Sequence, residues 1–258
     1  MPLNPKIASW AGKRVWVIGA STGIGAALAR QLLGAGARVA LSARRRAPLD
    51  ELARGTAGEA LVCPLDVTDR ARIDAAAREV LAHWGGFDLV MLVAGTHMAM
   101  RAETWDLARA RTLLDVNLHG VLNCLDAALP TLLVQASGGI AIVASVAGYI
   151  GLPQALVYGP SKAALINLAE SLYGDLHPRG IGVYLVNPGF VDTPLTRRNG
   201  FTMPALIGAD DAARRTLAGI ARGDFEIHYP RRFTRWLKLA RILPYRLQFA
   251  AVRRATGT

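Results

Sequence analysis

The sequence predicts an α/β fold in which one doubly wound parallel sheet carries helices on both faces. Three features predict it: short apolar segments alternate with longer segments of helical periodicity, the links are short, and a glycine-rich turn joins the first apolar segment to the first helical one. The strands are expected near residues 14–19, 37–42, 60–63, 87–93, 139–144, 181–187 and 225–228. The helices are expected near residues 24–34, 70–83, 104–135 (two helices), 155–177 and 209–222.

Length and composition indicate one domain with a large core. The chain has 258 residues, of which 52% are hydrophobic, and a single α/β domain of this size is ordinary. Residues 1–230 are expected to form that domain, with a substrate loop at 194–208, and residues 231–258 to form an extension. The two cysteines, Cys63 and Cys124, stand in apolar segments and are interpreted as core residues.

The same features predict a cytoplasmic protein. Cysteines without a disulfide pattern are typical of the reducing cytosol. Residues 1–10 lack the apolar segment of a signal peptide, and no uninterrupted apolar run approaches the length that spans a membrane. The chain shows no set of side chains with metal-ligand spacing, so no metal is expected.

The glycine-rich turn is the first candidate binding site. Residues 14–18 are predicted to form a buried strand and residues 26–33 a helix. Backbone N–H groups at a helix N-terminus bind phosphate, and glycines let the chain approach a pyrophosphate closely. The turn is therefore interpreted as a dinucleotide site, with a plain strand-to-helix loop as the alternative. Its residues are Gly19, Ser21, Thr22, Gly23, Ile24 and Gly25.

Tyr158 and Lys162 form a second candidate site, because residues four apart share one face of a helix. The Lys162 ammonium group would lower the pKa of the Tyr158 phenol, since a nearby positive charge favours phenolate. Ser145, at the end of an apolar segment, could donate a hydrogen bond to the same substrate oxygen. Together the three side chains could pass a proton to or from a carbonyl or alcohol oxygen. Taken alone, a Tyr-x-x-x-Lys pair is more typical of a solvated helix face.

Both motifs, in this order and at this distance, resemble the short-chain dehydrogenase/reductase family over residues 10–229. The resemblance implies a Rossmann-like fold, a nicotinamide cofactor and a homodimer or homotetramer. Asn117 stands where the family carries a helix asparagine, which would hold a water that links Lys162 to solvent; a polar side chain that satisfies a helix kink is the alternative. Other matches resemble segments that touch the adenine or flank the nicotinamide. They are Asp66, Val67, Ala94, Gly95, Pro188, Gly189, Val191 and Thr193.

One segment departs from the family pattern. Most members have Asn-Asn-Ala-Gly after the fourth strand, whereas this chain has Leu92-Val93-Ala94-Gly95. The missing asparagine at Val93 is thought to brace the sheet, so local bracing rather than chemistry is in question. Ala94 and Gly95 still offer the cofactor a small surface for close approach.

Arginines after the second strand favour NADP(H) over NAD(H). An acidic residue there would hydrogen-bond to the adenosine ribose and repel a phosphate, whereas the planar fork of arginine suits a 2′-phosphate. Arg44 is the first candidate for this contact and Arg45 the second, while Arg46 is expected to be solvated. The alternative is that all three are solvated charges on a loop.

The chemistry and the resemblance together predict interconversion of a carbonyl and an alcohol by hydride transfer. Tyr158 would supply the proton, Ser145 would orient the oxygen, and Lys162 would serve both Tyr158 and the nicotinamide ribose. Apolar side chains in the expected pocket walls predict a lipophilic substrate, although lids are also apolar where they close onto protein. The expected wall residues are His97, Met98, Tyr149, Ile150, Leu152, Gln154, Leu195, Phe201, Met203, Leu206 and Ile207.

Two other functions remain open on the same fold: a non-catalytic dinucleotide sensor, and an epimerase or dehydratase. The presence of a proton relay argues against a sensor, which has no need of one. The glycine spacing and the short C-terminal region argue against the epimerase or dehydratase.

The C-terminal extension is basic and amphipathic. No acidic residue follows Glu226, and residues 231–254 supply eight of the positive charges in a chain of formal net charge +11. Pro244 is expected to end or kink a helix that begins near Arg231. The basic residues Arg231, Arg235, Lys238 and Arg241 are expected on a separate stripe from the apolar one. The apolar residues at helical spacing are Phe233, Trp236, Leu237, Ala240 and Leu243.

Three interpretations of the extension remain open. Its apolar stripe packs on the domain or across an oligomer interface, or it lies on an anionic membrane surface. Nucleic-acid binding through the basic charge is the least favoured. Apolar residues in the helix after Tyr158 also indicate an oligomer; they are Leu165, Leu168, Ala169 and Leu172.

Overall fold

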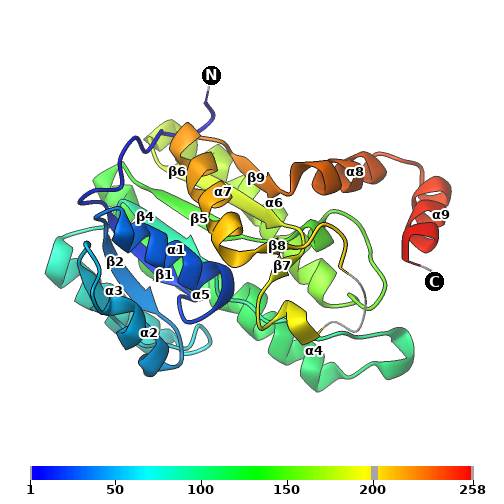
Figure 1. The fold of residues 1–258 in the computed structure, drawn as a ribbon, viewed down its shortest axis with the longest axis horizontal. Coiled ribbons are helices and arrows are strands. Elements are labelled where there is room, and N and C mark those ends of the chain that lie inside the picture. Colours follow the sequence, from blue (N-terminus) through cyan, green and yellow to red (C-terminus); the bar gives the residue numbers. More distant parts are fainter. Residues whose placement is uncertain (1, 199–202, 257–258) are drawn as a thin grey trace.

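The computed structural model describes residues 2–198 and 203–256, and Figure 1 shows a central sheet between two layers of helices. Seven parallel strands lie in the order β3-β2-β1-β4-β5-β6-β9. They are β1 (Arg14–Ile18), β2 (Arg38–Ser42), β3 (Ala60–Val62), β4 (Leu89–Leu92), β5 (Gly139–Val143), β6 (Gly182–Pro188) and β9 (Glu226–Tyr229). The predicted fold class and the seven predicted strands are confirmed.

The two faces of the sheet are covered by different helices, each layer closing its own hydrophobic core. The first layer is α3 (Arg70–Trp84), α5 (Gly120–Gln135) and α6 (Tyr158–Leu176); the second is α1 (Gly23–Gly34), α2 (Arg46–Ala53) and α7 (Ala209–Arg222). Side chains alternate between the faces along each strand, so Trp16 and Ile18 face the first layer while Val15 and Val17 face the second. Parallel strands are buried on both faces, which explains their continuous apolar sequences.

Buried polar groups tie neighbouring strands together. The Trp16 indole donates to Ser42 Oγ at 2.9 Å, and Ser42 Oγ donates to the Cys63 carbonyl at 2.7 Å, so three strands are linked. Cys63 and Cys124 are buried free thiols, as predicted for core residues, and burial raises the pKa of each thiol to about 12.

The region predicted as two helices over 104–135 contains a π-helical turn between them. α4 (Leu107–Leu114) continues through a π-helical turn at Asp115–His119 into α5. A π-turn inserts an extra residue into the helix and changes which side chain faces inward. Here it places Asn117 fully inside the protein.

Two elements differ from the sequence expectation. α6 begins at Tyr158 rather than near residue 155. α2 is not among the helices predicted from the sequence. Pro48 lies in the first turn of α2, where its missing N–H would have no helical partner. The short strands β7 (Val191–Asp192) and β8 (Ile207–Gly208) pair with each other outside the main sheet.

The C-terminal extension forms α8 (Arg231–Arg241) and α9 (Tyr245–Thr256), which lead away from β9 (Figure 1). The predicted apolar stripe is corrected in one respect: Trp236 and Leu243 do not join the packed face but are exposed. Lys238, predicted on the basic stripe, pairs with Glu226. No helix in the described ranges combines the length and apolarity needed to cross a bilayer.

Asn4 anchors the N-terminal segment to β6. Its amide donates to the Val183 carbonyl at 2.6 Å and accepts from the Val183 N–H at 2.9 Å. Asn4→Ala leaves both buried backbone groups unpaired, so we expect the free energy of unfolding to fall by about 1–3 kcal/mol. Equilibrium urea unfolding measures the loss, with exposed Lys6→Ala as the control; equal stability of the two variants would contradict this role.

Candidate functional site

The carboxyl ends of the parallel strands open into one cleft of about 780 Å³. Loops that follow parallel strands meet at the same edge of a sheet, where ligands bind such folds. Of the predicted catalytic and cofactor-binding residues, only Asn117 does not line the cleft. The wall includes Gly19, Ser21, Thr22, Gly23, Ile24, Gly25, Arg44, Arg45, Asp66, Val67, Ala94, Gly95, Ser145, Tyr158, Lys162, Pro188, Gly189, Val191 and Thr193.

The turn before α1 requires its glycines. Gly19 and Gly23 have φ values of +106° and +58°, which side chains rarely tolerate. A Cβ at Gly25 would lie 2.1 Å from the Gly19 carbonyl oxygen, so even alanine would open the turn. Thr22 makes no side-chain capping bond, which leaves the first N–H groups of α1 for an anion.

Backbone hydrogen bonds to β1 hold the segment after β4 at Val93, where the family carries an asparagine. The N–H groups of Val93 and Ala94 both donate to the Ile18 carbonyl, at 2.9 and 2.8 Å. A Cβ at Gly19 would lie 2.5 Å from the Ala94 nitrogen, so the two chain segments are in direct contact. The Val93 side chain packs against the core on the α1 side of the sheet.

Asn117 clamps Thr96 to the π-turn. Its Oδ1 accepts from the Thr96 N–H at 2.7 Å, and its Nδ2 donates to the Thr96 carbonyl at 2.9 Å and to Ser161 Oγ at 3.2 Å. The side chain therefore bonds to a neighbouring segment and does not satisfy a kink in its own helix, which was the alternative. Thr96 lines the cleft; it was not predicted, although its place just beyond a parallel strand is a usable signal.

Tyr158, Lys162 and Ser145 meet at one part of the wall. Tyr158 is the first residue of α6, and Lys162 lies one turn later with Nζ 5.9 Å from the Tyr158 ring centroid. Lys162 Nζ donates to the Val143 carbonyl at 3.0 Å. Ser145 begins a 3₁₀ turn, accepts from the Ala147 N–H at 3.2 Å, and is 8% exposed.

Burial shifts the pKa values of Lys162 and Tyr158 so that the uncharged form of each side chain is favoured. It lowers the pKa of Lys162 to about 8. It also raises the pKa of Tyr158, and hydrogen bonding with Ser145 only partly opposes the rise. The expected lowering of the Tyr158 pKa by Lys162 is therefore not found in this structure, because loss of hydration outweighs a charge that points to Val143. The phenol is held protonated, as a proton donor requires.

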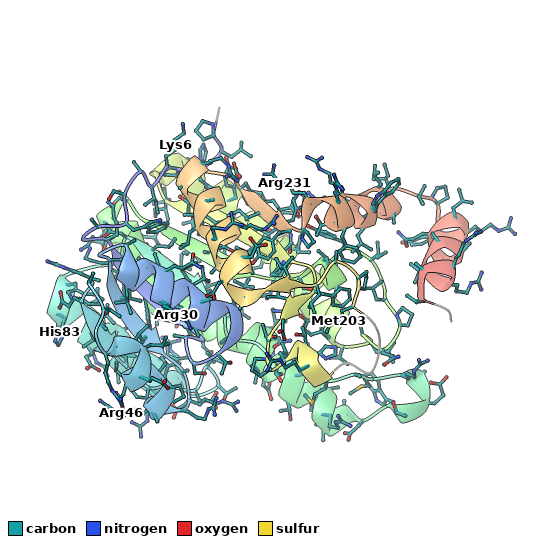
Figure 2. The ribbon with its side chains drawn as sticks, viewed as in Figure 1. Lys6, Arg30, Arg46, His83, Met203 and Arg231 are labelled. Carbon is teal, nitrogen blue, oxygen red and sulfur yellow. The ribbon has the colours of Figure 1, made fainter. Side chains whose placement is uncertain are left out.

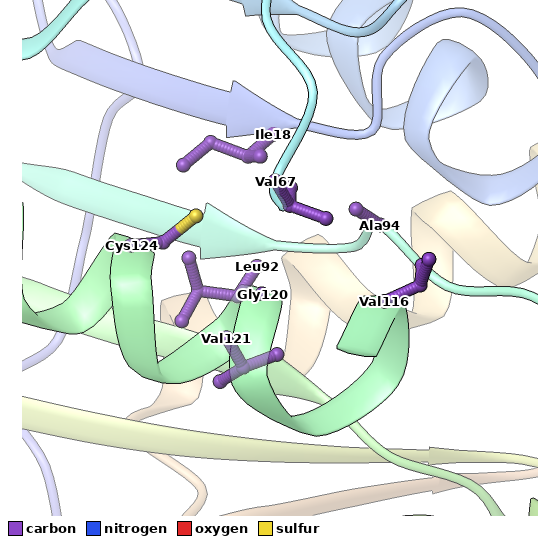
Figure 3. A pocket seen from close by; sticks show the side chains of 8 residues that line it. All are labelled: Ile18, Val67, Leu92, Ala94, Val116, Gly120, Val121 and Cys124. Carbon is purple, nitrogen blue, oxygen red and sulfur yellow. The ribbon is translucent and has the colours of Figure 1, made fainter. Parts of the chain in front are cut away.

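An apolar floor lies beneath the cleft (Figure 3). Four of its residues, Ile18, Val67, Ala94 and Val116, also line the cleft itself. A Cβ at Gly120 would lie 2.6 Å from Val67 Cγ2, so glycine is needed for α5 to pack there. The remaining floor residues are Leu92, Val121 and Cys124.

The three arginines after β2 separate into two groups. Arg44 and Arg45 line the cleft. Arg46 starts α2 and pairs with Asp50 at 3.4 Å, with most of its side chain exposed. Figure 2 shows Arg46 on the outer surface of α2, so its predicted solvated position is confirmed.

The expected pocket walls are partly corrected. Met98 and Leu195 line the cleft, and the His97 ring meets the Tyr158 ring edge-on at 4.7 Å. Burial lowers the pKa of His97, which keeps the imidazole neutral.

Tyr149, Ile150 and Leu152 instead pack against the core, because the segment after Ser145 turns inward and the Tyr149 hydroxyl donates to Glu226. Gln154 takes a left-handed φ of +63°, and its carbonyl accepts from Met100. Leu206 is 45% exposed, Ile207 packs on the core beside α7, and Phe201 lies outside the described residues. Thr112 and Thr196 line the cleft without being predicted, since only tertiary packing brings α4 and the 196–198 turn there.

The chain is similar to known proteins in both sequence and fold. The family model described as short chain dehydrogenase matches residues 13–202. An uncharacterized oxidoreductase of Myxococcus xanthus is 37% identical over 242 residues, covering 92% of this chain and 95% of its own. An uncharacterized oxidoreductase of Staphylococcus epidermidis is 38% identical over 185 residues, covering 72% and 80%. The crystal structure of a short chain dehydrogenase from Burkholderia cenocepacia in complex with NADP has a TM-score of 0.83, 26% identity, and coverage of 95% and 98%.

The glycine turn can be tested by adding one methyl group. In Gly25→Ala the new Cβ collides with the Gly19 carbonyl, so we expect the affinity for a nicotinamide dinucleotide to fall roughly 10-fold or more. Isothermal titration calorimetry measures the loss. Gly34→Ala at the other end of α1 is the control, because a Cβ there meets nothing within 4 Å. Unchanged affinity in Gly25→Ala would exclude the turn as the phosphate site.

The buried Lys162 predicts an alkaline gain in stability. The folded chain releases this proton near pH 8, whereas the unfolded chain keeps it until about the ordinary value of 10.5. Between these values the unfolded state binds more protons, so stability rises with pH. Relative to Lys162→Met, the wild type should gain on the order of 3 kcal/mol between pH 8 and pH 10.5. Urea unfolding across this range measures the difference, and a flat difference would contradict the assignment.

Proposed function

The chain belongs to the short-chain dehydrogenase family and is an oxidoreductase of that type, and we propose that it interconverts a carbonyl and an alcohol with NADP(H). One observation carries this proposal: Tyr158, Lys162 and Ser145 stand in the wall of the same cleft that contains the glycine turn. A proton-transfer group and a dinucleotide cradle in one cleft are what hydride transfer to a carbonyl requires.

The cleft fits a dinucleotide in chemistry as well as position. The uncapped N-terminus of α1 suits the pyrophosphate, and Ala94 and Gly95 permit close approach of the chain to the ligand. Asp66 stands beside the floor, with Oδ1 accepting from the Thr68 N–H and hydroxyl. When bound, the cofactor supplies or accepts the hydride.

In the reductive direction, Tyr158 donates its proton to the carbonyl oxygen as negative charge develops there. Ser145 donates a hydrogen bond to the same oxygen and so orients it. Lys162, one helical turn away, stabilises the phenolate once the proton has left. In the oxidative direction the same groups act in reverse, with Tyr158 accepting the alcohol proton.

Asn117 completes the relay by fixing the segment that faces Lys162. A Cβ at Gly95 would lie 3.4 Å from Asn117 Oδ1 and 3.5 Å from Lys162 Nζ, so the two side chains flank one small space. A water in this space would return a proton to Lys162 from solvent.

The substrate is proposed to be lipophilic. Met98, Leu195 and Val143 contribute apolar surface to the cleft, and the neutral His97 ring lies against Tyr158. Apolar side chains in this part of the wall favour a carbonyl compound whose other atoms are mostly hydrocarbon.

A homodimer or homotetramer is also proposed. Leu165 and Ala169 cannot support it, because both are fully buried in the chain's own core. α5 gives better support, since Leu122 and Val134 are 42% and 88% exposed on its outer face.

Tyr158→Phe tests the proton donor. Removing the hydroxyl should lower kcat by about 100- to 10,000-fold while leaving NADPH affinity within a few-fold, because the ring remains in the wall. Oxidation of NADPH over a panel of lipophilic ketones and aldehydes gives the rate, and fluorescence titration gives the affinity. Tyr173→Phe, on the far end of α6, is the control. Full activity in Tyr158→Phe would refute the mechanism.

Arg44 and Arg45 test the choice of cofactor. In Arg44→Ala/Arg45→Ala, loss of charged hydrogen bonds to the 2′-phosphate should lower the preference for NADPH over NADH by about 10- to 100-fold. The ratio of kcat/KM for the two cofactors measures this. Arg46→Ala, in its ion pair outside the cleft, should leave the ratio unchanged. A double variant with the wild-type ratio would show that 2′-phosphate recognition lies elsewhere.

A further inference from the structure

The extension has one face that is fixed to the domain. On α8, Phe233 and Leu237 pack against the core, and Thr234 is fully buried. Lys238 pairs with Glu226, which also accepts from Tyr149 and Asn187. α9 is tied back to α8, since Gln248 Nε2 donates to the Ala240 carbonyl at 2.9 Å. These contacts determine which side chains of the extension must face outward.

The outward side of α8 and α9 exposes large apolar side chains among its arginines. We call the following set the C-terminal patch: Trp236 (74% exposed), Leu239 (53%), Ile242 (78%), Leu243 (39%), Tyr245 (74%), Leu247 (58%) and Phe249 (55%). Single exposed apolar residues are normal, but seven on two consecutive helices and the link between them indicate an interaction surface. In Figure 1 the two helices project from one end of the molecule, away from the sheet.

The charge around the C-terminal patch has one sign. The exposed basic residues of the extension are Arg231, Arg232, Arg235, Arg241, Arg246, Arg253 and Arg254. No acidic residue follows Glu226, and Glu226 is already paired with Lys238. A partner surface must therefore bury aromatic and aliphatic side chains while supplying negative charge beside them.

We propose that the C-terminal patch binds the surface of an anionic lipid bilayer. Trp, Leu and Ile enter the boundary between headgroups and acyl chains, and arginines beside them bind anionic headgroups. A second copy of the chain fits less well, because two such patches facing each other would bring fourteen arginines together without acidic partners. The extension would then lie in the plane of the membrane rather than cross it.

α8 packs against the segment beside the cleft, so a membrane bound at the C-terminal patch would lie close to the cleft. The Phe233 ring lies 3.2 Å from the position of a Cβ on Gly189 and packs against Phe190 with ring centroids 5.8 Å apart. Gly189 lines the cleft. A bilayer at the patch would therefore lie near the end of the cleft where, under the proposed function, a lipophilic substrate is bound.

Co-sedimentation of the full chain with phosphatidylcholine vesicles, with and without phosphatidylglycerol, tests the proposal. We expect binding only to the anionic vesicles, weakening as salt is raised. Trp236→Ser/Leu239→Ser/Ile242→Ser should weaken it at least about 10-fold. Arg235→Gln/Arg246→Gln/Arg253→Gln/Arg254→Gln should weaken it more than about 100-fold, at roughly five-fold for each charge.

Matched controls separate the patch from general surface effects. Leu3→Ser/Trp105→Ser/Leu107→Ser removes apolar residues of similar exposure elsewhere, and Arg54→Gln/Arg72→Gln/Arg78→Gln/Arg179→Gln removes the same charge. Both should retain most of the binding. The proposal fails if anionic vesicles do not sediment the wild type, or if patch and control variants bind alike. It also fails if the patch variant loses only self-association in analytical ultracentrifugation. None of these readouts requires substrate turnover, so they are independent of the proposed reaction.

Discussion

The contact between the ends of β1 and β4 is the constraint on which the site depends. The Ile18 carbonyl accepts from both Val93 and Ala94, and Gly19 lies against the Ala94 backbone with no room for a side chain. These strands are neighbours in space but are separated in sequence by β2 and β3. Their contact brings the glycine turn beside the segment that Asn117 clamps. A cleft built on this contact can hold one extended ligand across both halves of the sheet.

Burying a lysine beside a tyrosine costs stability and, under the proposed function, would serve proton transfer. Lys162 is 4% exposed and makes one hydrogen bond, to Val143, so its charge is poorly compensated within the protein. The same loss of hydration holds the Tyr158 phenol protonated. Catalytic groups whose pKa values are moved by burial are typical of sites where function outweighs stability. A negatively charged oxygen and a positively charged cofactor ring near these groups would change that balance during the reaction.

Much of the fold and of the candidate site could be predicted because the relevant signals are local. Apolar runs mark the strands, positive φ at Gly19 and Gly23 follows from the turn, and Tyr158 and Lys162 are joined by one helical turn. What failed depended on tertiary packing. The inward course of the chain after Ser145 takes Tyr149 to Glu226, a residue 77 positions away. The ion-pair partner of Lys238, Glu226, likewise lies on β9, and helical periodicity alone cannot identify such partners.

The proposed mechanism requires a Tyr158 phenol whose acidity responds to charge in the cleft. Difference absorbance of the phenolate band, wild type minus Tyr158→Phe, isolates this group and can be followed against pH with and without NADP⁺. Without NADP⁺ we expect the pKa of Tyr158 to lie above the ordinary tyrosine value, because burial disfavours the phenolate. We expect a lower pKa in the complex, because the positive nicotinamide ring stabilises the phenolate. A Tyr158 titration that NADP⁺ leaves unchanged would contradict the proposed mechanism.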